Sequence, residues 1–189
     1  GKVFVEGLRE VELPDIESAK TALELGWQAR QSASNGVNDD SSRSHAVFPL
    51  RVLALTEATD GLQRVRTSRL HLVDLAGSER VKKSGADEDA SGRRMKEAIN
   101  INTSLLGLSN VMKALGTAAS HVPYRDSKLT HMLSDALGGN CRTSLVVCVS
   151  PAASDASEST GTLEFGSRAM KVRTHAVVNS SEVALDAAA

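Results

Sequence analysis

Two short polar segments of the chain hold side chains suited to chemistry on a phosphate group. The first, residues 38–45, reads Asn-Asp-Asp-Ser-Ser-Arg-Ser-His and offers hydroxyl, amide and guanidinium groups. The second, residues 74–80, reads Asp-Leu-Ala-Gly-Ser-Glu-Arg and begins with a carboxylate at the end of an apolar stretch. Phosphoryl transfer needs groups that hold a water in line and groups that follow a Mg²⁺ ion, and these segments supply both. Taken singly, either segment also fits a solvated loop or a strand-ending turn.

A third segment, residues 121–130, reads His-Val-Pro-Tyr-Arg-Asp-Ser-Lys-Leu-Thr, and it makes the first two segments more informative. In this order and at about this spacing, the three segments resemble the switch I, switch II and microtubule-facing segments of kinesin motor domains. The likeness extends from Val3 to about Asn179. It implies a three-layer α/β/α fold of the kinesin-type P-loop NTPase class, with a partial motor domain over residues 1–179 and a tail over residues 180–189.

The resemblance also implies a function. The parent protein would be a motor that hydrolyses ATP and couples the reaction to movement along, or remodelling of, microtubules. Its cofactors would be ATP and Mg²⁺, its partner would be tubulin, and its location would be the cytoplasmic microtubule cytoskeleton. A small GTPase-like switch is the weaker interpretation, because only the Asp-x-x-Gly turn supports it and no base-recognition motif accompanies that turn.

In the first segment, the resemblance assigns residues to the nucleotide and its metal ion. Ser42 would bind Mg²⁺ directly, Ser41 would help to place the attacking water, and Asn38 would approach the phosphates. Arg43 would form a bidentate bridge with Glu79 of the second segment, because a guanidinium and a carboxylate match in geometry and charge. This bridge would close the two loops over the nucleotide.

In the second segment, the strand end and the glycine carry the expected roles. Asp74 would hold Mg²⁺ through a bound water, and Gly77 would let a backbone N–H approach the γ-phosphate because it has no side chain. The resemblance therefore implies a catalytic set of Ser41, Ser42, Arg43, Asp74, Gly77 and Glu79.

Contact with the microtubule is expected from local charge, since the tubulin surface is acidic. The resemblance assigns this contact to Arg80, Lys82, Lys83, Tyr124, Arg125 and Lys128. A solvated face is the alternative for the short basic run after the second segment. Three acids at positions 87–89 lie close to that run and are expected to weaken binding to an acidic lattice.

The sequence lacks one part that the expected reaction requires. No G-x-x-x-x-G-K-[ST] phosphate cradle occurs in the 189 residues. We therefore expect the chain to be the carboxyl-terminal half of a motor domain, inactive alone, with the first strands and the cradle preceding it. The alternatives are a non-catalytic microtubule-binding module and a truncated fragment. Residues 165–171 are faintly similar to armadillo-repeat kinesins, and the subfamily stays open.

Composition gives no support for a nucleic-acid partner, a membrane helix or a set of disulfides. The formal net charge is −1, from 22 basic and 23 acidic residues, so no overall basic field favours DNA or RNA. No apolar run reaches the roughly 20 residues of a membrane helix. Cys141 and Cys148 lack metal-ligand spacing and are expected to be reduced thiols with structural roles.

Apolar periodicity predicts the elements that position these segments. The strand around Pro49 should contain a bulge or lie at an edge, because proline cannot donate a ladder hydrogen bond. The first helix should bury one stripe, and the second should be largely buried. The expected elements are helices over residues 16–31, 93–115, 124–137 and 157–172, strands over 45–56, 65–75 and 143–150, and a neck-linker start, implied by the resemblance, over 172–179.

Overall fold

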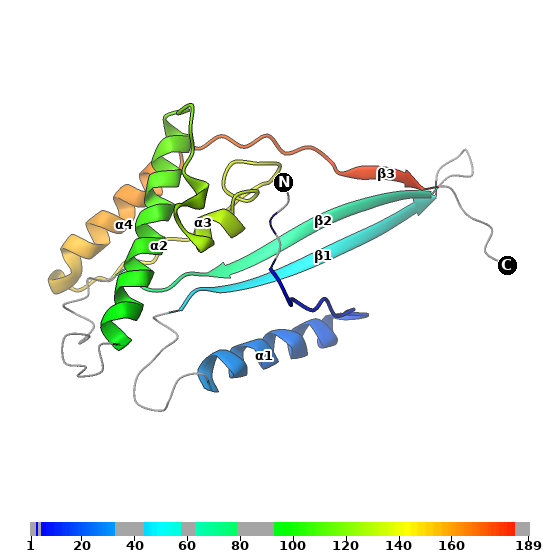
Figure 1. Ribbon diagram of the computed structural model, residues 1–189, viewed down its shortest axis with the longest axis horizontal. Helices are drawn as coiled ribbons and strands as arrows, with labels where there is room; N and C mark the ends of the chain where they lie inside the picture. Colours follow the sequence, from blue (N-terminus) through cyan, green and yellow to red (C-terminus); the bar gives the residue numbers. More distant parts are fainter. Residues whose placement is uncertain (1–2, 4, 33–43, 58–62, 79–92, 184–189) are drawn as a thin grey trace.

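The computed structural model describes residues 3, 5–32, 44–57, 63–78 and 93–183. The sequence predicts strands that alternate with helices, whereas in this part of the chain two consecutive antiparallel strands are followed by three helices and a short last strand. Figure 1 shows a long strand ribbon with α1 on one side and α2, α3 and α4 gathered around one end. The elements are α1 (Ile16–Ser32), β1 (Ala46–Glu57), β2 (Gln63–Asp74), α2 (Arg93–Gly116), the 3₁₀ turn η4 (Tyr124–Asp126), α3 (Lys128–Met132), the 3₁₀ turn η5 (Ala153–Asp155), α4 (Ala156–Ala169) and β3 (Ser180–Val183).

The ribbon is formed by β1 and β2, which pair without interruption from Ala46 opposite Asp74 to Glu57 opposite Gln63. Pro49 lies opposite His71 within this regular register, and β1 is the outer strand of the sheet order β1-β2-β3. The expectation of an edge is confirmed, because a proline at an edge costs no ladder bond. The register places the start of β1 beside the end of β2. The last residues of the first predicted segment, Ser44 and His45, therefore lie close to Asp74, the first residue of the second.

The buried core lies where α2 meets α3, η4 and α4. Its buried apolar side chains include Leu108, Val111 and Met112 from α2 and Leu129 and Leu133 from the α3 region. The long helix predicted over residues 93–115 is confirmed as α2. Of the α2 side chains that the structure describes, none from Ile99 to Leu106 is buried, and Ile99 is 51% exposed, so this part of the helix is less buried than expected.

Two other helix predictions need correction. The first helix is confirmed as α1, but its apolar stripe is exposed, including Leu23 and Trp27, because α1 contacts the described sheet chiefly at its last turn. The helix expected over residues 124–137 is a 3₁₀ turn followed by a single α-helical turn. Beyond Met132 the chain turns: the Leu133 carbonyl accepts from the N–H groups of Ala136 and Leu137, and the Ala136 carbonyl accepts from the Cys141 and Thr143 side chains.

The prediction of a strand over residues 143–150 is wrong for the described structure. This segment is extended but pairs with no described strand, and the side chain of Val146 is 83% exposed. An apolar segment becomes a strand only where a neighbour accepts and donates its backbone hydrogen bonds. No neighbour of that kind is present among residues 44–57, 63–78 and 93–183.

The last helix is confirmed as α4, and residues 180–183 of the predicted tail form β3 on the open side of β2. The polar loop predicted over residues 32–44 and the turn at Asp60-Gly61 lie almost wholly outside the described residues. In the described part of the chain, no helix is both long and apolar enough to cross a membrane.

Candidate functional site

The predicted site residues divide between described and undescribed parts of the chain. Asp74, Gly77, Tyr124, Arg125 and Lys128 are described. The remaining residues lie outside the described structure, and their roles stay predictions: Asn38, Ser41, Ser42, Arg43, Glu79, Arg80, Lys82 and Lys83.

The carboxylate of Asp74 lies at the tip of β2, where Arg30 of α1 holds it. Arg30 Nη1 lies 2.7 Å from Asp74 Oδ2, while its Nε and Nη2 donate to the hydroxyl and carbonyl oxygens of Ser44 at 3.0 and 2.7 Å. The Arg30 side chain is only 11% exposed, whereas that of Asp74 is 60% exposed. One guanidinium therefore joins Ser44, two residues before β1, to Asp74, the last residue of β2.

Arg30 was not among the residues predicted from the sequence. It stands in the last turn of α1, where a positive charge interacts favourably with the helix dipole. Its guanidinium also lies 5.4 Å from the ring centroid of Trp27, within the range of a cation–π contact. The spacing of Trp27 and Arg30, three residues apart, accounts for their contact on one helix face, but it does not reveal the bonds of Arg30 to Ser44 and Asp74.

His45 forms a second bridge from the same point of the fold. Its Nδ1 accepts a hydrogen bond from the backbone N–H of Ala76 at 3.0 Å, and its Nε2 lies 2.6 Å from Ser104 Oγ of α2. The Ser104 hydroxyl donates to the Ile101 carbonyl at 2.7 Å. Because an N–H can only donate, Nδ1 is unprotonated and the proton of the neutral ring sits on Nε2.

The environment of His45 favours this neutral form. Burial lowers the pKa of His45 below its usual range, and the positive charge of Arg30 lowers it further. Arg30 is itself paired with Asp74, so the charge beside His45 belongs to the same bridge. Gly77 directly follows the anchored Ala76 and is half-buried.

The segment with Tyr124, Arg125 and Lys128 is held by a buried threonine. Thr130 is fully buried, and its hydroxyl contacts the Tyr124 carbonyl and the Ser127 hydroxyl, each at 2.8 Å. Ser127 in turn caps α3 by accepting from the Thr130 N–H at 3.1 Å. This network joins η4 to α3.

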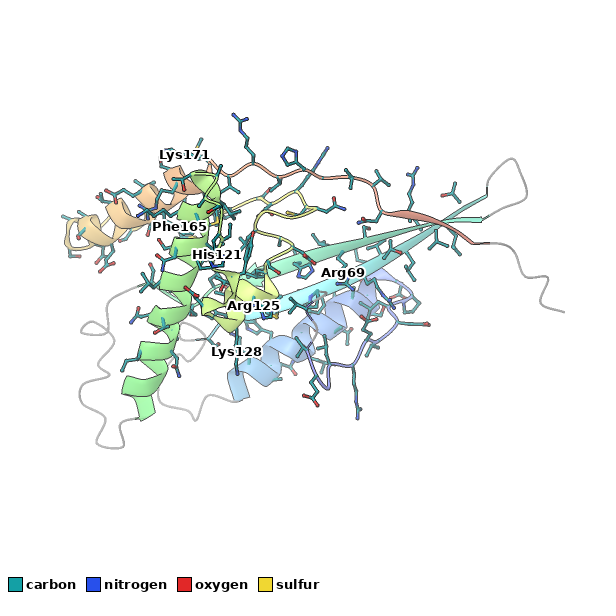
Figure 2. All side chains as sticks on the ribbon, turned by 45° about the horizontal axis from the view of Figure 1, so that its top comes forward. Arg69, His121, Arg125, Lys128, Phe165 and Lys171 are labelled. Atoms are coloured by element: carbon teal, nitrogen blue, oxygen red, sulfur yellow. The ribbon has the colours of Figure 1, made fainter. Side chains whose placement is uncertain are left out.

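The charged side chains of this segment are presented to solvent by that network. Arg125 and Lys128 are exposed, and Figure 2 shows them projecting from the η4–α3 region. Tyr124 is half-buried, and burial raises the pKa of its hydroxyl. The structure thus presents two cations on a hydrogen-bonded support.

Comparison with known proteins shows the family to which this chain belongs. A family model described as the kinesin motor domain matches residues 1–172. The chain belongs to the kinesin motor domain family. The armadillo-type similarity of residues 165–171 is not tested by this match and stays a prediction.

Similar full-length proteins extend well beyond the matched region. The chain is 44% identical over 187 residues to kinesin-like protein KIF7 of Homo sapiens, covering 95% of this chain and 14% of that protein. It is 42% identical over 191 residues to kinesin-like protein KIN-4C of Arabidopsis thaliana, again covering 95% and 14%. The chain thus spans a small part of the length of these relatives.

Solved kinesin structures share the fold. The chain matches a KIF14 dimer in its two-heads-bound state, with AMP-PNP and a microtubule, at a TM-score of 0.83 and 41% identity. That match covers 93% of this chain and 49% of the other. A structure of a fast kinesin matches at a TM-score of 0.74 and 37% identity, covering 98% of this chain and 50% of the other. The kinesin-type α/β fold predicted from the sequence is therefore confirmed.

The predicted start of the kinesin neck linker, residues 172–179, bonds to Asn140 and reaches β2 at its last residue. Asn140 Oδ1 accepts from the Val177 N–H at 2.6 Å, and Asn140 Nδ2 donates to Asn179 Oδ1 at 2.8 Å. The Asn179 carbonyl accepts from the Thr67 N–H at 3.2 Å, directly before β3 joins the sheet. Asn140, which sequence analysis did not single out, thus holds this segment at two points.

Proposed function

We propose that this chain is the nucleotide-sensing and track-binding part of a motor that hydrolyses ATP and moves along, or remodels, microtubules. One observation supports this function best. In a chain of the kinesin family, a single guanidinium joins Ser44, at the end of the first segment, to Asp74, at the start of the second. Two loops that respond to a γ-phosphate must move together, and this bridge couples them at their bases.

The nucleotide would be bound with the help of both segments. The described residues fit a magnesium-bound nucleotide in one respect: Asp74 is a hard oxygen ligand, largely exposed, and its carboxylate has acceptor capacity beyond the bond to Arg30. Mg²⁺ would neutralise charge on the phosphates when ATP is bound. Asp74 would accept from a water on that ion, while Ser42 would bind the ion directly.

The other residues of the first two segments would complete the site. Asn38 would approach the phosphates, Ser41 would orient the attacking water, and Gly77 would donate its N–H to the γ-phosphate. Arg43 and Glu79 would close the loops over the nucleotide by forming an ion pair. The phosphate cradle itself is expected from the rest of the motor domain.

The microtubule would be bound by cations on two segments of the chain. Tyr124, Arg125 and Lys128 lie on the η4–α3 support, and the exposed cations are attracted to an acidic lattice. The further contacts proposed are Arg80, Lys82 and Lys83. A cytoplasmic, microtubule-bound location follows from this partner.

A non-catalytic microtubule-binding module is the alternative, because no phosphate cradle is present in these 189 residues. Turnover of ATP by the complete protein that contains this chain, with and without microtubules, separates the two functions. The proposed motor shows turnover that microtubules stimulate. Microtubule binding with no ATP turnover would establish the alternative.

Variants of the same protein test the track contact. Arg125→Ala combined with Lys128→Ala should raise the microtubule concentration for half-maximal stimulation about fivefold, if each cation contributes about 0.5 kcal/mol. The matched control is Lys20→Ala, which removes an exposed cation from α1 and should leave this concentration unchanged. Equal behaviour of the two variants would contradict the assigned contact.

A further inference from the structure

We propose that His45 is a positioning residue that transmits movement between the loop after β2 and the track-facing segment. It does so through one hydrogen bond at each ring nitrogen, accepted at Nδ1 and donated from Nε2. The inference rests on the motor function proposed above and deepens it, because it names the side chain that links the nucleotide loops to the microtubule-binding surface.

The first step of the link is the bond between His45 and Ala76. Ala76 is only 5% exposed, so its backbone N–H needs an acceptor within the protein, and His45 Nδ1 supplies it at 3.0 Å. Ala76 lies two residues after Asp74 and directly before Gly77. A displacement of this loop therefore pulls on the imidazole.

The second step is the bond between His45 and Ser104 of α2. The neutral ring donates from Nε2 to Ser104 Oγ at 2.6 Å, while the Ser104 hydroxyl donates onward to the Ile101 carbonyl. The ring thus has one acceptor and one donor, each used on a different element. A rotation of the ring that kept one bond would break the other.

The third step runs along α2 to the track-facing segment. Gly107 lies three residues after Ser104, on the same side of the helix. A Cβ at position 107 would lie 3.3 Å from the hydroxyl of Ser127, so α2 and the start of α3 are in close contact there. Ser127 caps the helix that begins with Lys128. The connection from Ala76 to Lys128 therefore runs through the His45 imidazole, one turn of α2 and Ser127.

The packing of α2 does not require the bond between His45 and Ser104. Ser104 already satisfies its hydroxyl with the Ile101 carbonyl, so the bond to His45 adds a link between elements rather than completing the helix. The imidazole also stays neutral beside Arg30, although a charged ring would make a stronger donor to Ser104. Only the neutral ring can accept from Ala76 while it donates to Ser104.

The test measures the ratio of microtubule-stimulated to basal ATP turnover in the complete motor domain. His45→Asn keeps an acceptor near the position of Nδ1 and loses the donor to Ser104, and Ser104→Ala removes the same link from the other side. Each should lower the ratio about threefold to tenfold, as expected for one lost hydrogen bond. The double variant should lose no more than either single variant, because both break one link.

Two further variants separate coupling from folding. His45→Gln keeps a donor near the position of Nε2 and loses the acceptor for Ala76, so it should also lower the ratio. Thr103→Ala is the matched control: its hydroxyl is exposed and bonds to the Ile99 carbonyl on the same helix, and the ratio should stay as in the wild type.

The outcomes distinguish the inference from the function on which it rests. A wild-type motor that microtubules stimulate, with His45→Asn and Ser104→Ala stimulated equally well, would overturn the inference alone. A wild-type protein without stimulated turnover would overturn the proposed function and the inference with it. Loss of the ratio in both link variants but not in Thr103→Ala supports the coupling role.

Discussion

The guanidinium of Arg30 and the carboxylate of Asp74 lie 2.7 Å apart and join the end of α1 to the tip of β2. The pair differs from a surface ion pair because the Arg30 side chain is nearly buried and also bonds to Ser44 through two nitrogens. Exposed pairs contribute about 0–1 kcal/mol, whereas hydrogen bonds to charged groups contribute about 1.5–3 kcal/mol. Arg30 should therefore fix the base of the site.

Arg30→Lys tests this role, because an ammonium group cannot bond to Ser44 and Asp74 in the fork geometry of a guanidinium. We expect the free energy of unfolding of the complete motor domain to fall by about 1–3 kcal/mol, measured by urea denaturation. Lys20→Ala, which breaks the exposed pair with Glu17, should cost less than about 1 kcal/mol. An unchanged urea midpoint for Arg30→Lys would show that the bridge adds no stability.

The sequence predicts the described elements where local periodicity decides the outcome. The ranges of α1, β1, β2, α2 and α4 follow from apolar spacing, and of the bulge or edge predicted from Pro49 the structure shows the edge. The segment over residues 143–150 could not be predicted in the same way, because strand formation depends on a neighbouring backbone rather than on local apolar character. The early end of α3 at Met132 carries no local stop signal, because the first glycine after it is Gly138.

The candidate site shows the same division between local and long-range signals. Asp74 and Gly77 were predicted because they belong to a contiguous motif. Arg30 and Asn140 act through bonds to residues more than ten positions away, and no local pattern encodes such pairs. His45 lies within the predicted first segment, but its two bonds become visible only once β1, β2 and α2 are placed together.

The stability of the fold should depend on pH through His45. The pKa of His45 is lowered in the folded state, so the folded protein binds fewer protons than the unfolded chain below the ordinary histidine pKa of about 6.5. This contribution is therefore fully present above about pH 6.5 and is lost as the pH falls through the lower folded pKa. Urea midpoints between about pH 7.5 and pH 5 should fall more steeply for the wild type than for His45→Asn.

A histidine outside this network provides the control for the pH experiment. His131→Asn changes an exposed side chain of α3 and should keep the wild-type dependence on pH. If His45→Asn and the wild type lost stability in parallel, protonation of His45 would not be the cause.

Gly139 lies where the chain folds back against its own backbone. A Cβ at this position would lie 2.8 Å from the carbonyl oxygen and 3.1 Å from the Cα of Asp135, and backbone atoms cannot move aside cheaply. We expect Gly139→Ala to lower the free energy of unfolding by about 1–3 kcal/mol, measured by urea denaturation. Gly161→Ala in α4 meets nothing within 4 Å and should instead stabilise the helix by up to about 1 kcal/mol. Equal effects of the two substitutions would argue against a close approach at Gly139.

Asn140 should control how firmly the chain before β3 is held. Asn140→Ala removes the acceptor for the Val177 N–H and the donor to Asn179, so both residues should detach more often from the body of the domain. Hydrogen exchange of the Val177 amide should accelerate about threefold to tenfold, as expected for the loss of one hydrogen bond. Asn140→Asp keeps the acceptor and should protect Val177 while it loses the bond to Asn179. Unchanged exchange in Asn140→Ala would mean that other contacts hold the segment.

The 189-residue chain on its own should associate through its exposed apolar surface. Val146, Val149 and Leu145 are exposed along an extended segment, and further apolar side chains are exposed on α1. Unpaired extended backbone beside apolar side chains favours pairing with another chain. Size-exclusion chromatography of the chain expressed alone should show aggregates or oligomers, and Val146→Lys should shift the distribution towards smaller species by adding a charge. A monomer with a sharp, cooperative thermal transition would contradict this prediction, because it would show that the exposed surface is tolerated in water.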